Sequence, residues 1–324
     1  MKLLTICIPC HNSLTTMHKS ISSCLLMKEE LEVIIVDENS TDETYRIAKE
    51  YEKEYPDTIK VIKIGDYDSA IEAAIDHSEG LYFKVLQCQD YFDQPSLVSV
   101  IETLRDIIRI QANLDLLLTN YKVAIPEEKE YLYSYAKTLP TETLFGWHSL
   151  KKISQWTLFN NAALTFKTSI LKQIQHQVKQ MGNYFELWSY LALTHVKSMY
   201  YLNIPFYCFG KKPYQYDQYD SQYISDLLMT LFTSIDVYAL KSRKQRHYFI
   251  HYLSVVFIIA MVWFVNENQE ASKIKLWKEM ALHDPKLFKA IYHQLPGRRV
   301  GLDNKLGNTI LMKNYDLLKS KFHM

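Results

Sequence analysis

Short apolar runs alternate with amphipathic segments through the first eighty residues of the chain. Apolar runs of strand length occupy residues 3–9, 31–36 and 59–64, and each ends in polar or turn-forming residues. Between them, residues 17–25 and 69–77 carry apolar side chains at helical spacing, with Ser13 or Thr15 as candidate caps of the first helix. Strand and helix alternate, which predicts a parallel sheet with right-handed crossovers and helices on its faces.

A fourth apolar run, residues 80–86, stops abruptly at Gln87, Gln89, Asp90 and Asp93. We predict a buried strand that delivers polar side chains to the edge of the sheet. Ligands of open α/β sheets bind at the carboxyl ends of the strands, so chemistry is expected at this edge. A strand followed by a solvated turn has the same pattern, and the segment alone does not distinguish the two.

The last third of the chain has a different pattern. From residue 217 onward the apolar positions have helical spacing without strand alternation. A basic run at residues 241–247 precedes residues 252–265, which are nearly all apolar. A membrane-spanning helix needs about 20 such residues, so we predict a buried core helix. The alternative is peripheral docking, in which the basic run binds an anionic membrane surface.

Composition narrows the class of protein. The 324 residues are 48% hydrophobic and 23% charged, which is typical of a globular chain. A formal net charge of +1 gives no sign of a nucleic-acid partner, which would normally require a basic excess. Many Tyr and Phe residues, 24 and 14, supply rings that suit sugar-binding and interface surfaces.

Cysteine usage indicates the redox compartment. The five cysteines are an odd number, and no secretory signal peptide precedes them, which favours reduced thiols and a cytoplasmic protein. Cys7 and Cys10 form a C-x-x-C pair, but no second pair follows at the spacing that zinc requires. A buried strand thiol and a turn thiol are therefore expected.

Three motifs in the first half of the chain suggest a family. Residues 8–12 read I-P-C-H-N, residues 34–42 read I-I-V-D-E-N-S-T-D, and residues 80–83 read G-L-Y-F. In order and spacing they resemble the I-P-x-Y-N, V-V-D-D-G-S-T-D and G-E-Y-I motifs of the family 2 inverting glycosyltransferases. Later segments up to about residue 212 look like those of Gram-positive members that build surface polysaccharides.

The resemblance implies an α/β fold of the GT-A type, a Rossmann-like, mostly parallel sheet with helices on both faces. It divides the chain into a glycosyltransferase domain at residues 1–215 and a helical C-terminal subdomain at 216–324. Within the first domain, residues 1–110 would bind the nucleotide sugar and residues 111–215 the acceptor. The oligomeric state stays open.

The first two motifs are chemically sensible as a nucleotide site. Asp37 at a strand end can accept a hydrogen bond from the imide N–H of uracil or from a comparable base edge. Pro9, His11 and Asn12 are expected to line the sides of the base-binding site. For the following residues 40–42 we prefer a structural role, because acidic and hydroxyl side chains favour a helix N-terminus without any ligand.

The metal-binding motif of the family is altered. Its two Asp carboxylates align with Gln87 and Gln89 when counted from Tyr82, and the second aligns with Asp90 when counted backward from Pro95. Gln87 and Gln89 are expected to face the nucleotide, and Asp90 is the candidate ligand for Mn²⁺ or Mg²⁺. Those cations prefer anionic oxygens to amide carbonyls, so a divalent metal is weakly supported.

Two further positions also depart from the family. Glu72 and Ala74 replace the Asn and the Gly of an Asn-x-Gly near the diphosphate, with Asp66 and Asp68 nearby. These acids would repel a diphosphate unless they face solvent.

The catalytic carboxylate pair is missing, and Glu186 is the nearest candidate for the base that deprotonates the acceptor. The sequence fits a purely structural role of Glu186 equally well, since an acidic residue in the first turn of a helix is favourable without any ligand.

A pair of basic residues can neutralise some of the negative charge of the diphosphate. Lys211, followed by Lys212, falls near the family's diphosphate-binding basic residue, although a Lys-Lys pair is more commonly solvated.

Two functions remain in competition. The first is transfer of a sugar, with inversion, from a nucleotide-sugar donor to a hydroxyl of a cell-surface glycan or lipid-linked acceptor. Such an enzyme would be cytoplasmic, with peripheral contact at the inner face of the plasma membrane. The second is a catalytically silent relative that acts as a binding or scaffold partner of an active transferase, and the altered motifs motivate it.

Overall fold

The computed structural model describes residues 2–65, 69–123, 130–151, 157–182, 184–210 and 221–294, with only the backbone of Asn266. The chain divides into two compact units. The first joins residues 1–151 and 159–212, and the second joins residues 152–158 and 213–324. The predicted domain boundary at residue 215 lies outside the described residues.

The first unit is built on one mixed sheet in the strand order β3-β2-β1-β4-β9-β6-β10-β5, with β7 added to β6 and β8 to β10. The strands are β1 (Leu4–Cys10), β2 (Leu31–Glu38), β3 (Ile59–Ile64), β4 (Tyr82–Val85), β5 (Tyr91–Phe92), β6 (Leu116–Val123), β7 (Tyr131–Tyr133), β8 (Leu144–Phe145), β9 (Leu164–Lys167) and β10 (Met199–Phe209). The first four strands pair in parallel, as do β6 and β10. Strand β9 runs antiparallel between β4 and β6 and joins these two parallel parts.

The parallel strands are apolar because helices cover both faces of the sheet. All but the last residue of β2, whose sequence is LEVIIVDE, are buried, and β1 has the same character. Continuous apolar runs of this kind are typical of strands buried on two faces. The predicted alternating α/β fold is therefore confirmed, and its antiparallel strands are an addition that the sequence pattern did not predict.

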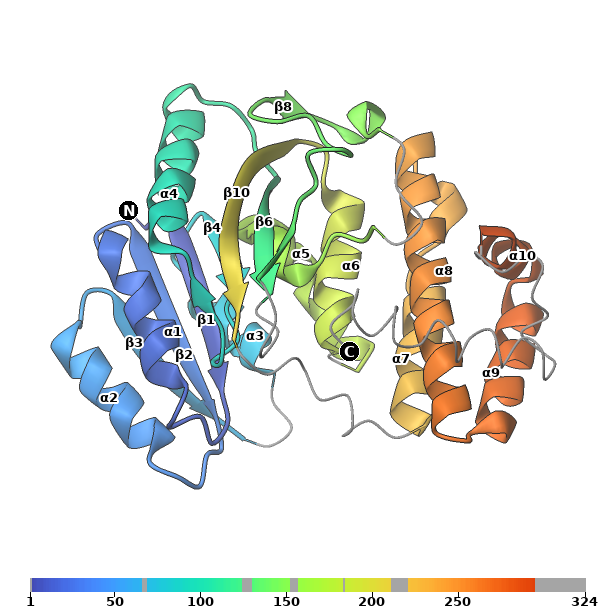
Figure 1. The fold of residues 1–324 in the computed structure, drawn as a ribbon, viewed down its shortest axis with the longest axis horizontal. Coiled ribbons are helices and arrows are strands. Elements are labelled where there is room, and N and C mark those ends of the chain that lie inside the picture. The colour runs from blue at the N-terminus through green and yellow to red at the C-terminus, as the bar shows by residue number, and fades with distance from the viewer. Residues whose placement is uncertain are drawn as a thin grey trace. The chain divides into compact units, whose positions relative to one another are not determined.

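The described part of this unit contains six α-helices: α1 (Met17–Cys24), α2 (Thr44–Glu54), α3 (Ala70–His77), α4 (Gln94–Arg109), α5 (Thr168–Gln180) and α6 (Phe185–His195). Helices α1, α2 and α4 lie on one side of the sheet, and α3, α5 and α6 on the other (Figure 1). Short 3₁₀ turns occur at η1 (Leu25–Met27), η2 (Trp147–Ser149) and η3 (Asn161–Ala163). This arrangement leaves the carboxyl ends of β1, β2 and β4 side by side at one edge of the sheet.

Side-chain caps fix where two of these helices begin. Ser69 accepts a hydrogen bond from the Glu72 N–H at the start of α3, and Asp93 accepts one from the Ser96 N–H at the start of α4. The predicted cap of α1 is wrong, because its N-cap is Thr16 and no side chain caps it. Instead, the carbonyl of Ser13 accepts from the N–H groups of both Thr16 and Met17, at 3.0 Å each.

The second unit is helical, as predicted. Its helices are α7 (Ser221–Thr233), the 3₁₀ turn η5 (Val237–Ala239), α8 (Arg243–Asn266), α9 (Glu270–His283) and α10 (Pro285–Gln294). Trp277 on α9 packs its ring against Phe257 of α8 and Phe288 of α10, with ring centroids 5.3 and 5.4 Å apart. These aromatic contacts connect three of the helices into one core.

Helix α8 is longer than the apolar segment predicted it to be, because the basic residues form its first turns. Among the described helices, α8 is long and apolar enough over Arg243–Val265 to span a membrane, and its most apolar 18-residue window has a mean hydropathy of 2.2. In the structure 72% of its most apolar window is buried. Such burial is typical of a core helix, which is what the sequence predicts.

Candidate functional site

Asp37 lies near the carboxyl end of β2 and is completely buried. One of its oxygens, Oδ2, accepts a hydrogen bond from the N–H of Ser40 at 3.3 Å. The other, Oδ1, is shielded from solvent and has no hydrogen-bond partner among the described residues. Because a buried polar atom without a partner is costly, this oxygen is suited to accept a hydrogen bond from a ligand.

The loops around Asp37 are held together by Asn12. Its backbone N–H donates to the Ser40 hydroxyl at 3.0 Å, and its Oδ1 accepts from the Thr41 N–H at 2.8 Å. Asn12 itself has a φ of 46°, in the left-handed region that Asn tolerates better than most residues. The contacts of Ser40 and Thr41 agree with the structural role preferred for them, and Asn12 is a loop-fixing residue in addition to any ligand contact.

Two other predicted wall residues flank this loop. Pro9 is half-buried in β1, and His11 is exposed, with Nδ1 lying 2.7 Å from the carbonyl oxygen of Glu38. Burial raises the pKa of the neighbouring Glu38 carboxyl. The exposed imidazole and the buried Asp37 thus lie on adjacent strand ends, where a planar group could be bound between loop and sheet.

The segment after β4 forms a turn that β10 holds in place. The N–H of Asp90 donates to the carbonyl of Gln87 at 2.8 Å, and the N–H of Gln87 donates to the hydroxyl of Tyr207 at 3.2 Å. Gln87 and Gln89 are half-buried, whereas Asp90 is 1% exposed. The two amides can therefore reach a ligand at the surface of the turn, while the carboxyl of Asp90 points into the protein.

Both oxygens of Asp90 already have protein partners. The Tyr207 hydroxyl donates to Oδ2, and the Gly210 N–H donates to Oδ1 at 2.8 Å. Burial raises the pKa of Asp90 to about 6, although both hydrogen bonds favour the ionised form. Asp90 connects the turn after β4 to the end of β10.

Gly210 is required at this junction for a steric reason. A Cβ atom at this position would lie 2.3 Å from the carbonyl oxygen of Gln89, which no real side chain tolerates. Neither Gly210 nor Tyr207 was predicted as a site residue, because nothing in their local sequence indicates a contact with a turn about 120 residues away. An isolated Gly directly after a strand is the one signal that could have pointed to a close backbone approach.

The described residues fit a divalent cation poorly. Mn²⁺ and Mg²⁺ prefer several oxygen ligands, carboxylates above all, and no group of three or more His, Cys, Asp or Glu side chains in the described ranges could hold one. Asp90 is committed to Tyr207 and Gly210, and Asp93 accepts from Ser96 as the cap of α4. The metal role of Asp90 stays a prediction, and this donor set counts against it.

Glu186 lies in the first turn of α6. Its side chain is half-buried, and its Oε2 is shielded from solvent without a hydrogen-bond partner among the described residues. Burial raises the pKa of the Glu186 carboxyl. A carboxylate whose pKa is raised toward neutrality is a stronger base than an ordinary surface Glu, as proton abstraction requires.

Lys84 is a buried charge that sequence reasoning missed. It sits in β4, is 1% exposed, and its Nζ donates to the carbonyls of Ala162 and Leu164 at 2.8 and 3.1 Å. Burial lowers the pKa of Lys84 to about 7. Lys84 ties the strand that leads into the Gln87–Asp90 turn to η3 and β9.

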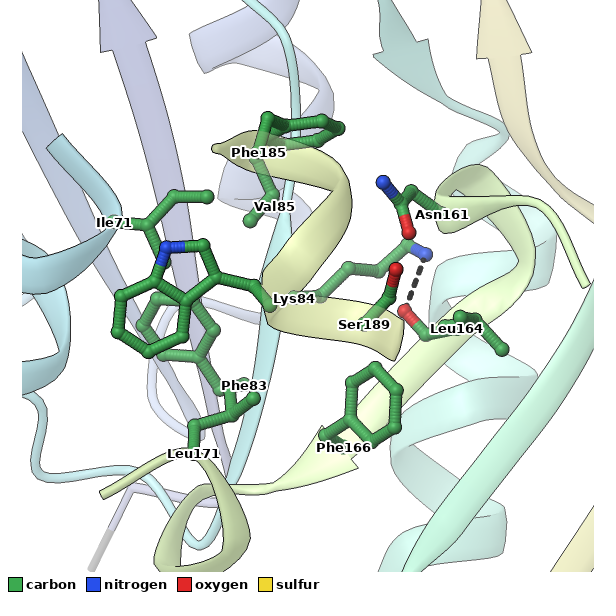
Figure 2. Close-up of a pocket in the computed structure, with 11 residues that line it drawn as sticks. Ile71, Phe83, Lys84, Val85, Asn161, Leu164, Phe166, Leu171, Phe185 and Ser189 are labelled. Carbon is green, nitrogen blue, oxygen red and sulfur yellow. Dashed lines mark hydrogen bonds between the residues drawn. The ribbon is translucent and has the colours of Figure 1, made fainter. Parts of the chain in front are cut away.

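A small cavity adjoins Lys84 beneath the N-terminal half of α6 (Figure 2). Its volume is about 40 Å³, and its lining is mostly apolar apart from Lys84, Asn161 and Ser189. Since one water occupies about 30 Å³ in the liquid, the cavity has room for a water molecule and not for a sugar nucleotide. The predicted donor residues lie elsewhere, at the carboxyl ends of β1 and β2 and in the segments that follow β1 and β4.

The acidic segment before α3 is partly explained. Glu72 forms an ion pair with Lys179 of α5, with Oε1 and Nζ 2.9 Å apart, so its charge is compensated within the protein. Asp66, Asp68, Lys211 and Lys212 lie outside the described residues.

The N-terminal part of the chain is similar to known proteins. Residues 5–112 match the sequence model of the family described as Glycosyl transferase family 2. A processive diacylglycerol beta-glycosyltransferase from Mycoplasma pneumoniae is 21% identical over 202 residues, which cover 57% of this chain and 58% of that protein. The match therefore spans little more than half the length of this relative.

Solved structures are similar over nearly the whole chain. S. aureus TarS 1-349 superposes with a TM-score of 0.69 at 17% identity, covering 98% of this chain and 92% of that one. The same TarS fragment in complex with UDP-GlcNAc gives 0.67 at 15%, with the same coverage. A mannosyltransferase from Pyrobaculum calidifontis, in complex with GDP-Man and Mn²⁺, gives 0.51 at 13%, covering 98% and 85%. At these identities the likeness shows the fold, and it confirms the predicted GT-A type.

Proposed function

We propose that this chain transfers a sugar from a nucleotide-sugar donor to an acceptor hydroxyl, with inversion. The acceptor in this proposal is a cell-surface glycan or a lipid-linked saccharide. The match of residues 5–112 to glycosyltransferase family 2 supports sugar transfer in general, and the residues of this chain support the assignment of roles.

One observation carries the proposal. Among the buried side-chain atoms of the described residues that lack a hydrogen-bond partner, the carboxylate oxygens are Asp37 Oδ1 and Glu186 Oε2. Both carboxylates were predicted from the sequence, one to bind the nucleotide base and one to deprotonate the acceptor. An unpaired buried carboxylate is too costly to persist without a reason, and ligand groups would supply the missing donors.

The donor is a uridine nucleotide sugar in this proposal. Asp37 accepts the imide N–H of the base, Pro9, His11 and Asn12 flank the ring, and Gln87 and Gln89 donate to the ribose or the diphosphate. The unpartnered oxygen of Asp37 supports this assignment, since an imide N–H is the donor it lacks. The complexes of TarS with UDP and with UDP-GlcNAc support uridine as the base.

The acceptor hydroxyl is deprotonated by Glu186 as it attacks the anomeric carbon. The proton passes from the hydroxyl to the carboxylate while the bond from the anomeric carbon to the diphosphate breaks, which inverts the configuration. The raised pKa of Glu186 supports this role. The departing diphosphate carries negative charge, and in this proposal the ammonium group of Lys211 neutralises part of it.

Contact with a membrane is a further part of the proposal. Lipid-linked acceptors reside in membranes, and the relative from Mycoplasma pneumoniae is named for a diacylglycerol acceptor. Residues 241–247 are rich in Lys and Arg and would bind anionic headgroups on the cytoplasmic side. Co-sedimentation with anionic vesicles at low salt tests this contact, and failure to sediment would contradict it.

Nucleotide binding and turnover test the function itself. Purified protein is titrated with UDP with and without Mn²⁺, and release of UDP from a panel of UDP-sugars is then followed. We expect UDP to bind and at least one sugar donor to be turned over in the presence of an acceptor. UDP binding without turnover of any donor would favour the scaffold function, and absence of any nucleotide binding would refute both the donor site and the transfer reaction.

A further inference from the structure

Two cysteines meet at the edge of the sheet where the donor residues lie. Cys10 is the last residue of β1, and Cys88 lies in the turn after β4. Their sulfur atoms are 2.9 Å apart, and both residues are buried. A disulfide bond is about 2.05 Å long, so the two sulfurs need to approach by only about 0.9 Å to form one.

The backbone brings these thiols together. Strands β1 and β4 pair in parallel with Cys7 opposite Val85, and the N–H of Leu86 donates to the carbonyl of Cys7 at 2.9 Å. Cys10 and Cys88 each lie three residues beyond this last pair. The strand register therefore brings the two residues to the same part of the sheet edge, where their sulfur atoms meet.

The distance between the two sulfur atoms is what makes this pair a candidate for redox chemistry. Once one of the two thiols has been oxidised to a sulfenic acid, the other is already placed to attack its sulfur.

We propose that Cys10 and Cys88 form a redox-active dithiol, which a peroxide closes to a disulfide and a small thiol reopens. The Cys88 thiolate attacks one peroxide oxygen, which breaks the O–O bond and gives a sulfenic acid and hydroxide. The Cys10 thiol then attacks the Cys88 sulfur, which forms the S–S bond and expels the sulfenic oxygen as water, while the hydroxide takes up the proton that the Cys88 thiol lost when it ionised. Two thiols and one peroxide give one disulfide and two waters.

The consequence rests on the proposed function, because the dithiol lies inside the proposed donor site. Cys10 is flanked by Pro9 and His11, and Cys88 by Gln87 and Gln89. Closing the bond draws the base-binding loop and the Gln87–Asp90 turn together by up to about 0.9 Å, whereas binding sites must be held within about 0.5 Å of their productive geometry. The oxidised protein is expected to bind UDP about tenfold more weakly than the reduced protein, an order-of-magnitude expectation.

Peptide mapping tests the dithiol itself. The full chain is treated with hydrogen peroxide, free thiols are alkylated, and the digest is analysed by mass spectrometry without reduction. We expect one cross-linked pair, Cys10 with Cys88, which disappears after dithiothreitol. The variant Cys24→Ser should keep the cross-link, while Cys10→Ser should lose it and leave a sulfenic acid on Cys88 that dimedone traps. Free thiols at both positions after peroxide, or a link from Cys10 to Cys7, would overturn the proposal.

Calorimetry with UDP on the reduced and the oxidised protein tests the regulation. The regulation is supported if peroxide weakens UDP binding and dithiothreitol restores the affinity. Equal UDP affinity of both forms overturns the regulation, although the cross-link itself would still be established. If the reduced protein binds no UDP at all, the donor site and its regulation are both refuted, and the mass of the cross-linked peptide still decides whether the dithiol exists. The two failures are therefore distinguishable.

Discussion

Asp37 and Asp90 look alike in the sequence and differ in the structure. Both follow an apolar strand, and both are buried, at 0% and 1% exposed. Asp37 has one oxygen without a partner among the described residues. Asp90 has both oxygens bound, by the Tyr207 hydroxyl and the Gly210 N–H.

This difference separates two kinds of buried charge in the same unit. We call Asp37 and Glu186 open, because each has a buried oxygen that lacks a partner, and Asp90 and Lys84 satisfied, because protein groups bind their charged atoms. An open charge costs stability until a ligand completes it, whereas a satisfied charge holds neighbouring segments together. Removing an open charge should therefore impair function, and removing a satisfied one should impair folding.

The largest effect is expected at Glu186. Replacing it with Gln keeps the shape of the side chain and removes the base, so turnover of a UDP-sugar should fall about 10²- to 10⁴-fold. UDP affinity should change little, because the role proposed for Glu186 concerns the acceptor and not the donor. Initial rates and UDP titrations on the same preparation measure both quantities. Wild-type turnover by Glu186→Gln would show that another group is the base.

The pH dependence of turnover tests the same residue without mutation. Glu186 must be ionised to accept a proton, and burial raises its pKa, so the acid limb of the profile should lie above the usual range for Glu. On that limb the rate should rise about tenfold per pH unit until Glu186 is ionised. If the acid limb of the pH profile lay at the ordinary pKa of a carboxylate, the base would be a solvent-exposed group.

Lys84→Met removes a satisfied charge and should destabilise the fold. The carbonyls of Ala162 and Leu164 would lose their donor, and each buried acceptor without a partner costs about 1–3 kcal/mol. We expect the free energy of unfolding to fall by about 2–4 kcal/mol, measured by urea denaturation. Lys53→Met on the exposed face of α2 is the matched control and should be nearly neutral. Equal stabilities of the two variants would contradict the assignment of Lys84 to the satisfied charges.

Tyr207→Phe tests the satisfied carboxylate. The change removes the hydroxyl that donates to Asp90 and accepts from the Gln87 N–H, and it keeps the packed ring. Stability should fall by about 1–3 kcal/mol, since one buried carboxylate oxygen and one N–H lose a partner. Tyr45→Phe on α2 provides the comparison. If Asp90 instead served only as a metal ligand, adding Mn²⁺ would restore the stability of Tyr207→Phe.

The smallest effect is expected for the stability of Asp37→Asn. This change removes an unpaired buried charge and keeps an oxygen that can accept from Ser40. Stability should stay the same or rise by up to about 1 kcal/mol, as is common when a functional site is neutralised. A loss comparable to that of Tyr207→Phe would place Asp37 among the satisfied charges. Thermal denaturation of both variants in one buffer makes the comparison.

Local pattern was sufficient to predict most of the parallel half of the sheet. The strand at Ile59–Ile64 has the predicted bounds, and the observed ends of β1 and β2 differ from the predicted ones by no more than two residues. Residues Leu4–Cys10 and Val33–Val36 are nearly all apolar because both faces of the sheet are covered there, and such a run can be recognised in the local sequence. The antiparallel insertion of β9 between β4 and β6 was not predictable, since it depends on pairing with strands up to about eighty residues away.

The candidate site, too, was predicted only where the local sequence was sufficient. Asp37 directly follows the apolar run that predicted β2 and is the penultimate residue of that strand. Lys84 gave no signal, because a lysine inside an apolar run does not indicate which carbonyls it will meet. The partners of Asp90 come from β10 and the residue after it, so the local sequence could not tell an open carboxylate from a satisfied one.

Calorimetric titration of UDP into the wild-type protein and into Asp37→Asn tests the donor site most directly. We expect the wild type to bind UDP and Asp37→Asn to bind about 10- to 100-fold more weakly, since a hydrogen bond to a charged group contributes about 1.5–3 kcal/mol. Asp42→Asn, in the exposed part of the same loop, should bind as the wild type does. Equal affinities of Asp37→Asn and the wild type, or no binding of UDP by either, would contradict a nucleotide-sugar site at the end of β2.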